Sequence, residues 1–203
     1  MDKYSADALR FLMLSSPVLA GEDFALIDKD VSDVARKLSM IWNVFDFFTI
    51  YASVDGFDSN YAISVSKLEN PLDIWLVSKV YVLRNQITAG MEAYNTPNAL
   101  SEVLTFIDDL SNWFVRRSRR RFWKSEDDND KNAAYSTLYY TLVYLAKLLA
   151  PFTPFLAEEL YQKMTGAASD SSIVESVHLL DWPEAGEIDQ EVLNKMERTR
   201  EMI

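Results

Sequence analysis

Apolar residues recur along this chain at the spacing of one helix face. The longest run moves in steps of three and four residues and comprises Val31, Val34, Leu38, Ile41, Phe45, Phe48 and Ala52. This period places its members on one stripe of an α-helix. Asp55-Gly56 and the polar residues after it interrupt the pattern, as happens at a helix end. The pattern predicts a long amphipathic helix over residues 31–52.

Three further helices are predicted to begin where a polar residue precedes proline. Asn70-Pro71 and Thr96-Pro97 each combine an N-cap residue with a proline in the first turn, and Thr153-Pro154 restarts a helix after Pro151. This last helix should stop near Gly166. The apolar stripes of the first two helices are Leu76, Val80, Leu83, Ile87, Met91 and Tyr94, and then Leu100, Val103, Leu104, Ile107, Leu110 and Phe114.

The remaining segments are shorter or less regular. Residues 5–15 form a predicted helix capped by Ser5 and ended by Ser16-Pro17. Residues 126–130 read as a solvated acidic connection before a helix that carries Leu138, Leu142, Leu145 and Leu149. Val177-His178-Leu179 is predicted to be extended, and residues 188–202 form a last amphipathic piece.

Helices of this length joined by short connections favour an antiparallel bundle. We therefore predict an all-α fold of about five helices, with a short irregular connecting segment near its start. Five Gly and six Pro in 203 residues also favour long regular elements over a turn-rich β-sandwich. The expected division is a connecting segment at 1–27, the helical bundle at 28–183, and the start of an extension helix at 184–203.

A dense basic and aromatic block, residues 113–124, stands out in an acidic chain. Its cationic residues are six of the chain's 20: Arg116, Arg117, Arg119, Arg120, Arg121 and Lys124. The other 14 face 31 acids, so the rest of the chain carries 14 − 31 = −17. Guanidinium groups interleaved with the indoles of Trp113 and Trp123 suit a nucleic acid, because phosphates take charge-assisted hydrogen bonds and bases stack on flat side chains.

A helical projection from Ile107 predicts which way the block points. At about 100° per residue, Arg116, Arg120 and Trp123 project away from the core, and Arg119 and Trp113 lie on the flanks. Arg121 falls on the core stripe, so it is predicted to pair with a carboxylate of the bundle. From spacing alone, three interpretations of the block remain open: nucleic-acid contact, intramolecular pairing, and contact with a protein partner.

Catalytic chemistry finds no support in the sequence. The absence of Cys and the single His exclude disulfides, thiol catalysis and an ordinary zinc site. Asp108-Asp109 and Glu158-Glu159 are adjacent pairs, which cannot both point into one cleft from a helix. His178 is predicted to be structural. We expect no catalytic residue, no metal site and no cofactor in this chain.

Targeting signals and membrane spans are also not predicted. Residues 138–156 form the longest apolar stretch, but Lys147, Pro151 and Pro154 interrupt it, whereas a spanning helix needs about 20 apolar residues with few charges. No signal peptide follows Met1. We expect a cytoplasmic protein without a membrane partner.

Four segments, in order, resemble class I aminoacyl-tRNA synthetases. Residues 108–124 resemble a segment of isoleucyl-tRNA synthetases, and residues 4–11 are similar to the helix that follows the KMSKS loop. Residues 148–159 resemble the late-bundle helix break, which valyl and leucyl enzymes share. Ser176-Val177-His178-Leu179 with Asp181-Trp182-Pro183 resembles the closing segment of the isoleucyl enzymes.

This resemblance implies an anticodon-binding helical bundle and, for the basic block, a tRNA ligand. The HIGH and KMSKS sequences are absent, so the resemblance implies a catalytically inactive fragment of an enzyme that charges tRNA(Ile) with isoleucine using ATP and Mg²⁺. Its expected partners are tRNA(Ile) and the catalytic domain of the same enzyme. The expected tRNA-binding residues are Arg116, Arg119, Arg120, Trp123, Trp113, Arg117 and Lys124. An interdomain strut, or a valyl or leucyl type of bundle, is the alternative.

Overall fold

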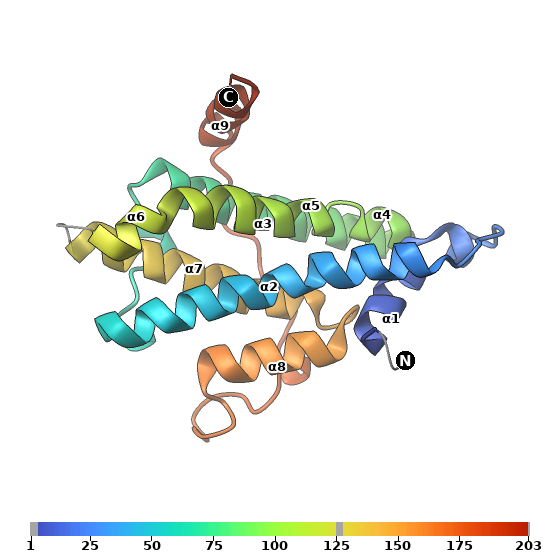
Figure 1. Cartoon of the computed structure of the whole chain (residues 1–203), viewed down its shortest axis with the longest axis horizontal. Coiled ribbons are helices and arrows are strands. Elements are labelled where there is room, and N and C mark those ends of the chain that lie inside the picture. Colours follow the sequence, from blue (N-terminus) through green and yellow to red (C-terminus); the bar gives the residue numbers. More distant parts are fainter. Residues whose placement is uncertain (1–3, 125–127, 203) are drawn as a thin grey trace.

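The computed structural model describes residues 4–124 and 128–202. Within these residues every regular element is helical, which confirms the predicted all-α fold (Figure 1). In the same part of the chain, no helix has both the length and the apolar content required to cross a bilayer. The elements are α1 (Ala6–Ser15), η1 (Pro17–Ala20), α2 (Asp28–Asp55), η2 (Ser59–Tyr61), η3 (Val65–Lys67), α3 (Pro71–Glu92), α4 (Thr96–Leu100), α5 (Val103–Asp108), the π-helix η4 (Asp109–Val115), α6 (Arg116–Lys124), α7 (Asp128–Leu149), α8 (Pro154–Thr165), η5 (Val177–Leu179) and α9 (Gln190–Glu201).

The long elements form an antiparallel bundle. Segments α4, α5, η4 and α6 follow one another along one axis, and we call them the rod (Figure 1). The rod packs against α2 and α3, its α6 end packs on α7, and α8 packs on α7. The consecutive runs α2, α3, the rod, α7 and α8 alternate in direction (Figure 1). The buried apolar side chains of these elements and of α1 form one continuous core.

Local capping sets the ends of these helices as predicted. The hydroxyl of Ser5 accepts a hydrogen bond from the backbone N–H of Ala8 at 3.2 Å, and the side chain of Asn70 accepts one from Leu72 at 3.0 Å. Gly56 ends α2 and Gly166 ends α8, at φ 68° and 72°. These left-handed conformations favour glycine, which lacks the Cβ that would clash there.

The end of α3 differs from the prediction. The structure ends this helix at Glu92, leaving Met91 43% exposed and Tyr94 97% exposed. The chain reverses here so that α4 can pack on Gly90, where a Cβ atom would lie 2.6 Å from the Cα of Ala99. Met91 and Tyr94, which follow this contact in the chain, therefore do not pack into the core. The apolar stripe of α3 is therefore shorter than the sequence pattern indicated.

The rod was predicted as one helix, but it contains a π-helical stretch. Its buried row advances in steps of four: Leu110, Phe114, Ser118 and Phe122. In an α-helix of 3.6 residues per turn this row would drift around the surface. A π turn holds more residues, so η4 compensates for the drift. The inward direction is kept as far as Phe122, inside the basic block.

Three of the sequence segments quoted above meet at the break between α7 and α8. The Asp7 carboxylate accepts a hydrogen bond from the N–H of Leu156 at 2.6 Å, in the first turn of α8. Arg10 donates to the carbonyl of Pro151 at 3.0 Å. From the other side, a ring nitrogen of His178 lies 3.3 Å from the carbonyl of Pro154, in keeping with the predicted structural role of this histidine.

The closing segment is a 3₁₀ turn, not the extended strand that the sequence pattern predicted. Glu158 of α8 accepts hydrogen bonds from the hydroxyl of Ser176 at 2.8 Å and from the N–H of Val177 at 3.0 Å. Ser176 in turn accepts from the N–H of His178 at 3.2 Å. These contacts tighten the backbone into η5. Burial acts to raise the pKa of Glu158, but these hydrogen bonds and one from Gln162 outweigh it and lower the pKa.

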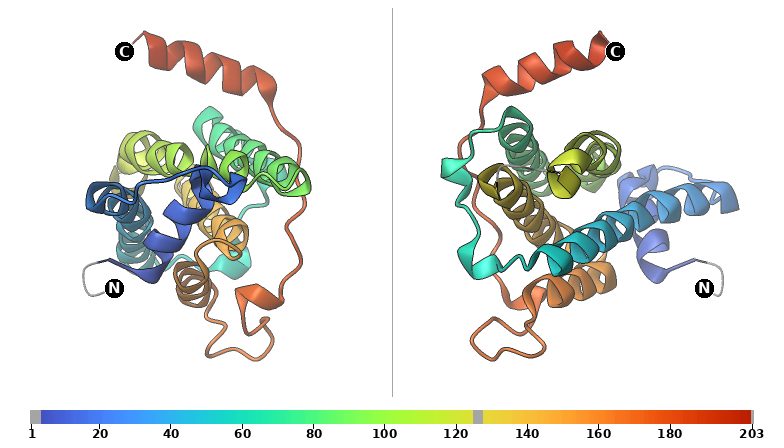
Figure 2. Two further views of the ribbon diagram at one scale, coloured as in Figure 1. Left: turned by 90° about the vertical axis from the view of Figure 1, so that its right-hand side faces the viewer. Right: turned by 60° about the vertical axis from the view of Figure 1, so that its left-hand side comes forward.

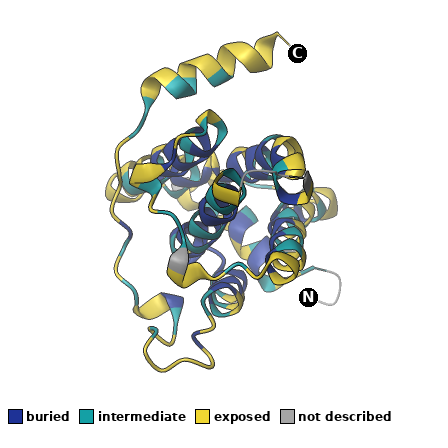
Figure 3. Ribbon diagram, turned by 90° about the vertical axis from the view of Figure 1, so that its left-hand side faces the viewer, coloured by how far each residue is buried: buried dark blue, intermediate teal, exposed yellow. Residues whose placement is uncertain are grey.

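Helix α9 lies on the outside of the bundle and packs against α3, at the end of a connection that runs along α3 (Figure 2). This connection is fixed by Arg84, which donates to the carbonyl of Pro183 at 2.9 Å, and by Ser78, whose hydroxyl accepts from the N–H of Asp189 at 3.1 Å. No residue of α9 is buried, and most of the helix is exposed (Figure 3). The proposed division at residue 184 falls within this connection.

Candidate nucleic-acid interface

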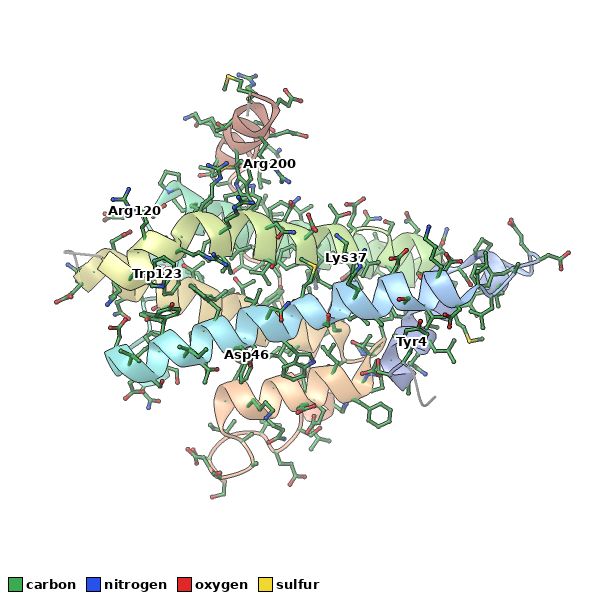
Figure 4. The ribbon with its side chains drawn as sticks, in the orientation of Figure 1. Tyr4, Lys37, Asp46, Arg120, Trp123 and Arg200 are labelled. Carbon is green, nitrogen blue, oxygen red and sulfur yellow. The ribbon has the colours of Figure 1, made fainter. Side chains whose placement is uncertain are left out.

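The outer face of α6 presents arginines to solvent. Arg116, Arg117, Arg119 and Arg120 are all exposed. Among the described residues, Arg116, Arg119 and Arg120 have no ion-pair partner within 4.0 Å, which separates them from the ion-paired surface helices that charge runs usually form. Arg120 points away from the bundle (Figure 4). The outer face thus carries several unpaired positive charges on one turn-and-a-half of helix.

Arg121, the next residue, points inward and is ion-paired, as the helical projection predicted. Its side chain is 12% exposed, and its guanidinium group binds Asp73 of α3 through two parallel hydrogen bonds of 2.7 Å. It also contacts Asp130 of α7, at 2.8 Å from Nε and 2.7 Å from Nη2. Asp130 therefore lies at the start of α7 in an ion pair, and its assignment to a solvated connection was wrong. Residues 126 and 127 of that connection lie outside the described residues.

The electrostatics of this triad favour the charged forms of Arg121 and Asp130, whereas burial raises the pKa of Asp73 despite the opposing effect of Arg121. Burial acts to lower the pKa of Arg121, but the hydrogen bonds to Asp73 and Asp130 outweigh it and raise the pKa. For Asp130, burial acts to raise the pKa, while Arg121 and Asn70 lower it below the ordinary value. Because Asp73 is completely buried, its charge depends on Arg121 for compensation. The triad ties α6, α3 and α7 together and is unavailable to a ligand.

The two tryptophans of the block lie in different settings. Trp113 is half-buried beneath α9, where its indole N–H donates to the sulfur of Met196 at 3.3 Å. The guanidinium carbons of Arg117 and Arg200 lie 3.9 Å and 5.0 Å from its ring centre. Stacking of a base on Trp113 thus requires α9 to move.

Trp123 is the more accessible of the two rings. It is 52% exposed and lies beside Tyr51 near the end of α2, with ring centres 6.1 Å apart (Figure 4). The side chain of Lys124, the last expected contact, lies outside the described residues. Among the expected binding residues, the structure therefore brings Arg116, Arg119, Arg120 and Trp123 to the open surface, and Arg117 is exposed with its guanidinium group over Trp113.

Asp109 anchors α9, a role that the sequence pattern did not indicate. This carboxylate is 3% exposed and lies 3.0 Å from Nζ of Lys79 and 2.7 Å from a guanidinium nitrogen of Arg200. Arg200 descends from α9 toward the rod (Figure 4). The adjacent Asp108 points elsewhere, to Lys37 of α2 at 2.5 Å. As expected from their adjacency, the two acids do not share a cleft.

A polar groove runs between α2 and the rod, next to the exposed arginines. It has a volume of about 350 Å³ and is lined by Asn43, Val44, Phe47, Ser111, Asn112, Val115, Arg116 and Arg119. Two of the exposed arginines therefore border a hollow as well as open solvent. No signal in the sequence pattern pointed to this groove, because its walls are about 70 residues apart along the chain.

Comparison with known proteins assigns a family to this arrangement. The model for the anticodon-binding domain of tRNA ligases matches residues 73–203. The chain belongs to this family. The match covers α3, the rod, α7 and α8, and so includes the outer face of α6 and the rod side of the groove.

Relatives of this anticodon-binding domain bear the name isoleucine–tRNA ligase. The protein from Chlamydia trachomatis serovar A is 39% identical over the whole chain, and that of Dehalococcoides mccartyi is 43% identical over 97% of it. The chain spans 19% of the length of each.

A solved structure shares the fold. It is the ternary complex of the agnB2 LeuRS of Agrobacterium radiobacter K84 with tRNA and LeuAMS. The similarity has a TM-score of 0.60 at 17% identity, and it covers 94% of this chain and 20% of that chain. At this identity the similarity concerns the fold alone.

Proposed function

We propose that this domain belongs to an isoleucine–tRNA ligase, and that the outer face of α6 binds the anticodon arm of tRNA(Ile). The observation that carries the proposal is the set of exposed, unpaired arginines in a chain whose remainder is strongly acidic. The names of the relatives, which match essentially the whole chain, support isoleucine as the amino acid.

Electrostatics explains how this face would hold RNA. Arg116, Arg119 and Arg120 would neutralise phosphates and release counterions, which supplies much of the affinity and makes it depend on salt. Trp123 would stack on a base, adding roughly 1–3 kcal/mol. The acidic remainder of the domain repels RNA placed elsewhere, so the basic face also sets the orientation of the bound arm.

The chemistry of aminoacylation belongs, in this proposal, to other parts of the enzyme. The described residues bring together no three metal-ligating side chains, and the sequence has neither HIGH nor KMSKS. ATP and Mg²⁺ would therefore act in the catalytic domain of the same enzyme, which is the second proposed partner. Residues 1–27 would connect to that domain, residues 28–183 would bind the tRNA, and residues 184–203 would begin an extension. A cytoplasmic location is part of the same proposal.

The strut alternative requires ion pairs between the block and carboxylates of the bundle or of the catalytic domain, and within the described residues one arginine of the block forms them. Arg121 forms the intramolecular ion pairs that this alternative requires, whereas Arg116, Arg119 and Arg120 have none among the described residues. A valyl or leucyl type of bundle has less support, because the fold similarity to LeuRS has only 17% identity.

The double variant Arg116→Ala/Arg120→Ala of the full-length enzyme tests the proposal. We expect tRNA(Ile) binding to weaken about 10- to 100-fold and the slope of log affinity against log salt to fall by about two. Fluorescence anisotropy at several salt concentrations measures both. The matched control is Arg36→Ala, an exposed arginine on α2 that pairs with Asp33. Unchanged affinity and slope in the double variant would show that the proposed face does not bind tRNA.

A further inference from the structure

The connection that leads into α9 is held firmly to the bundle. The hydroxyl of Tyr144 donates to the carbonyl of Glu184 at 2.6 Å. At Gly186 the backbone passes so close to α3 that a Cβ atom would lie 2.5 Å from the ring of Tyr81. Together with the two hydrogen bonds to α3 described above, these contacts fix the chain as far as Asp189. The start of α9 is therefore a fixed point about which the helix can pivot.

Between its two ends, α9 makes few apolar contacts with the bundle. A hollow of about 590 Å³ lies beneath it, and its lining includes Trp75 and Lys79 of α3 and Leu193 of α9. Val192, Leu193 and Met196 are the apolar residues of the helix, and all three are only half-buried. Burial of apolar surface, which holds the other helices in the core, therefore contributes little to the docking of α9.

The far end of α9 is held by contacts with the rod. Arg200 pairs with the buried carboxylate of Asp109, and its guanidinium carbon lies 5.0 Å from the ring centre of Trp113 (Figure 4). The guanidinium carbon of Arg117 lies 3.9 Å from the centre of the same ring, and the sulfur of Met196 accepts the indole N–H. Docked α9 therefore covers a tryptophan of the basic block and the arginine that lies on it.

The charges of α9 show that this helix is not an additional basic surface. Within Gln190–Glu201 three cationic residues are matched by three acids, so the net charge of the helix is 3 − 3 = 0. Arg200, which reaches the block, is already paired with Asp109, and Lys195 is paired with Glu191 at 2.5 Å. The docked helix thus covers part of the basic block without adding net positive charge that would attract a polyanion.

We infer that α9 is a displaceable cover that competes with tRNA for the basic block, an inference that rests on the proposed function. RNA that engages Trp113 or Arg117 displaces the Arg200 end of α9, while the helix pivots at Asp189. The coupling is reciprocal, so tRNA favours the open position of α9, and a change that loosens α9 favours tRNA binding. Under strict competition, the apparent association constant for tRNA is that of the open state multiplied by the open fraction.

The variant Arg200→Ala of the full-length enzyme tests the competition, because it removes the ion pair at the far end of α9. Lys79 remains 3.0 Å from Asp109, so this buried carboxylate keeps a partner. We expect tRNA(Ile) to bind about 2- to 10-fold more tightly although a positive charge is lost, as the open fraction rises from about 10–50% toward unity. The slope of log affinity against log salt should stay the same, because no phosphate contact is removed.

A matched control and a second measurement accompany this variant. Arg198→Ala removes the same charge from an exposed position of α9 that has no ion pair among the described residues, and it should not tighten binding. Fluorescence anisotropy measures the affinity of both variants at several salt concentrations. In the wild-type enzyme, saturating tRNA(Ile) should speed the hydrogen exchange of the α9 amides, with the amides of α7 as the internal reference.

The outcomes separate this inference from the proposed function. Weaker binding by Arg200→Ala, with a slope lower by about one, would show that Arg200 contacts a phosphate and that the inference is wrong. Unchanged affinity, or exchange in α9 that tRNA slows or leaves unaltered, also overturns it. In each of these cases the proposed function stands as long as Arg116→Ala/Arg120→Ala weakens binding. If this double variant binds tRNA normally, the proposed function fails and the inference fails with it.

Discussion

Arg120 and Arg121 are neighbours in the chain, yet they lie in opposite settings. Arg120 points into solvent and has no ion-pair partner among the described residues, whereas Arg121 binds two carboxylates and is 12% exposed. The two faces of α6 therefore use the same residue type for different purposes. The inner face connects helices, and the outer face is left open for a ligand. Positive charge density by itself does not distinguish these roles, but the presence of a carboxylate within 4.0 Å does.

The largest expected difference between the faces concerns stability. Arg121→Ala should lower the free energy of unfolding by about 3–5 kcal/mol, because Asp73 would remain buried without its partner. Arg120→Ala should change it by less than about 0.5 kcal/mol. Urea denaturation of both variants measures the difference. If both variants lost the same amount of unfolding free energy, the two faces of α6 would not differ in their contribution to stability. In Arg121→Met/Asp73→Leu, which leaves neither charge buried, stability should largely return.

A smaller effect is expected where α9 covers part of the outer face. Arg200→Ala removes the ion pair to Asp109 and one of the two guanidinium groups beside Trp113. We expect the free energy of opening α9 to fall by about 1–2 kcal/mol, with little change in the free energy of global unfolding. Hydrogen exchange of the α9 amides measures this opening, and the amides of α7 serve as the internal reference. Unchanged exchange in α9 would show that the Asp109 contact does not hold this helix.

The acid response of stability sharpens the contrast further. Arg121 and Asn70 lower the pKa of Asp130 in the folded state, so the pair stabilises the fold above the unfolded pKa of about 3.9. This contribution is lost as pH falls through the lower, folded pKa. Asp130→Asn should therefore be less stable than the wild type near pH 7, and the gap should narrow below about pH 4. Thermal unfolding of both proteins across this pH range measures the difference in stability. Asp46→Asn, at an exposed carboxylate on α2, should show no such narrowing.

The smallest effect is expected at Ser118, on the inner face. Its hydroxyl is fully buried and has no hydrogen-bond partner among the described residues. Ser118→Ala should leave stability unchanged or raise it by up to about 1 kcal/mol, because the unsatisfied hydroxyl is removed. Urea denaturation detects the change, with Ser53→Ala as the exposed control. A loss above 1 kcal/mol would mean that the hydroxyl contributes to the inner face.

Sequence reasoning predicted the parts of this contrast that are local. Capping residues such as Asn70 marked helix starts, and the projection of the basic block placed Arg121 inside and Arg116 outside. It did not identify Asp73, which lies 48 residues from Arg121, because periodicity shows which residues face inward but not which of them meet. The π-helix, which keeps Phe122 on the inner row, also leaves no clear mark on composition.

The candidate site was less predictable than the fold. The helical projection placed Trp123 on the outer face and Trp113 on a flank. It could not show that α9 covers Trp113, because this contact joins residues 83 positions apart. The groove depends on the packing of α2 against the rod, so neither segment alone indicates it. In this domain, single-helix patterns predicted exposure well, whereas they could not predict which distant element covers or completes a surface.

The hydrogen bond between Asp7 and Leu156 has a consequence for synthesis on the ribosome. The two residues are 149 positions apart, so the N–H of Leu156 that the Asp7 carboxylate binds does not exist until most of the domain has been synthesised. At about 5–20 residues per second, this delay is roughly 7 to 30 s. During that interval α1 can pack on α2 and α4, but its carboxylate has no helix terminus to cap until α8 has formed. The first helix of this domain is therefore expected to be among the last to complete its contacts.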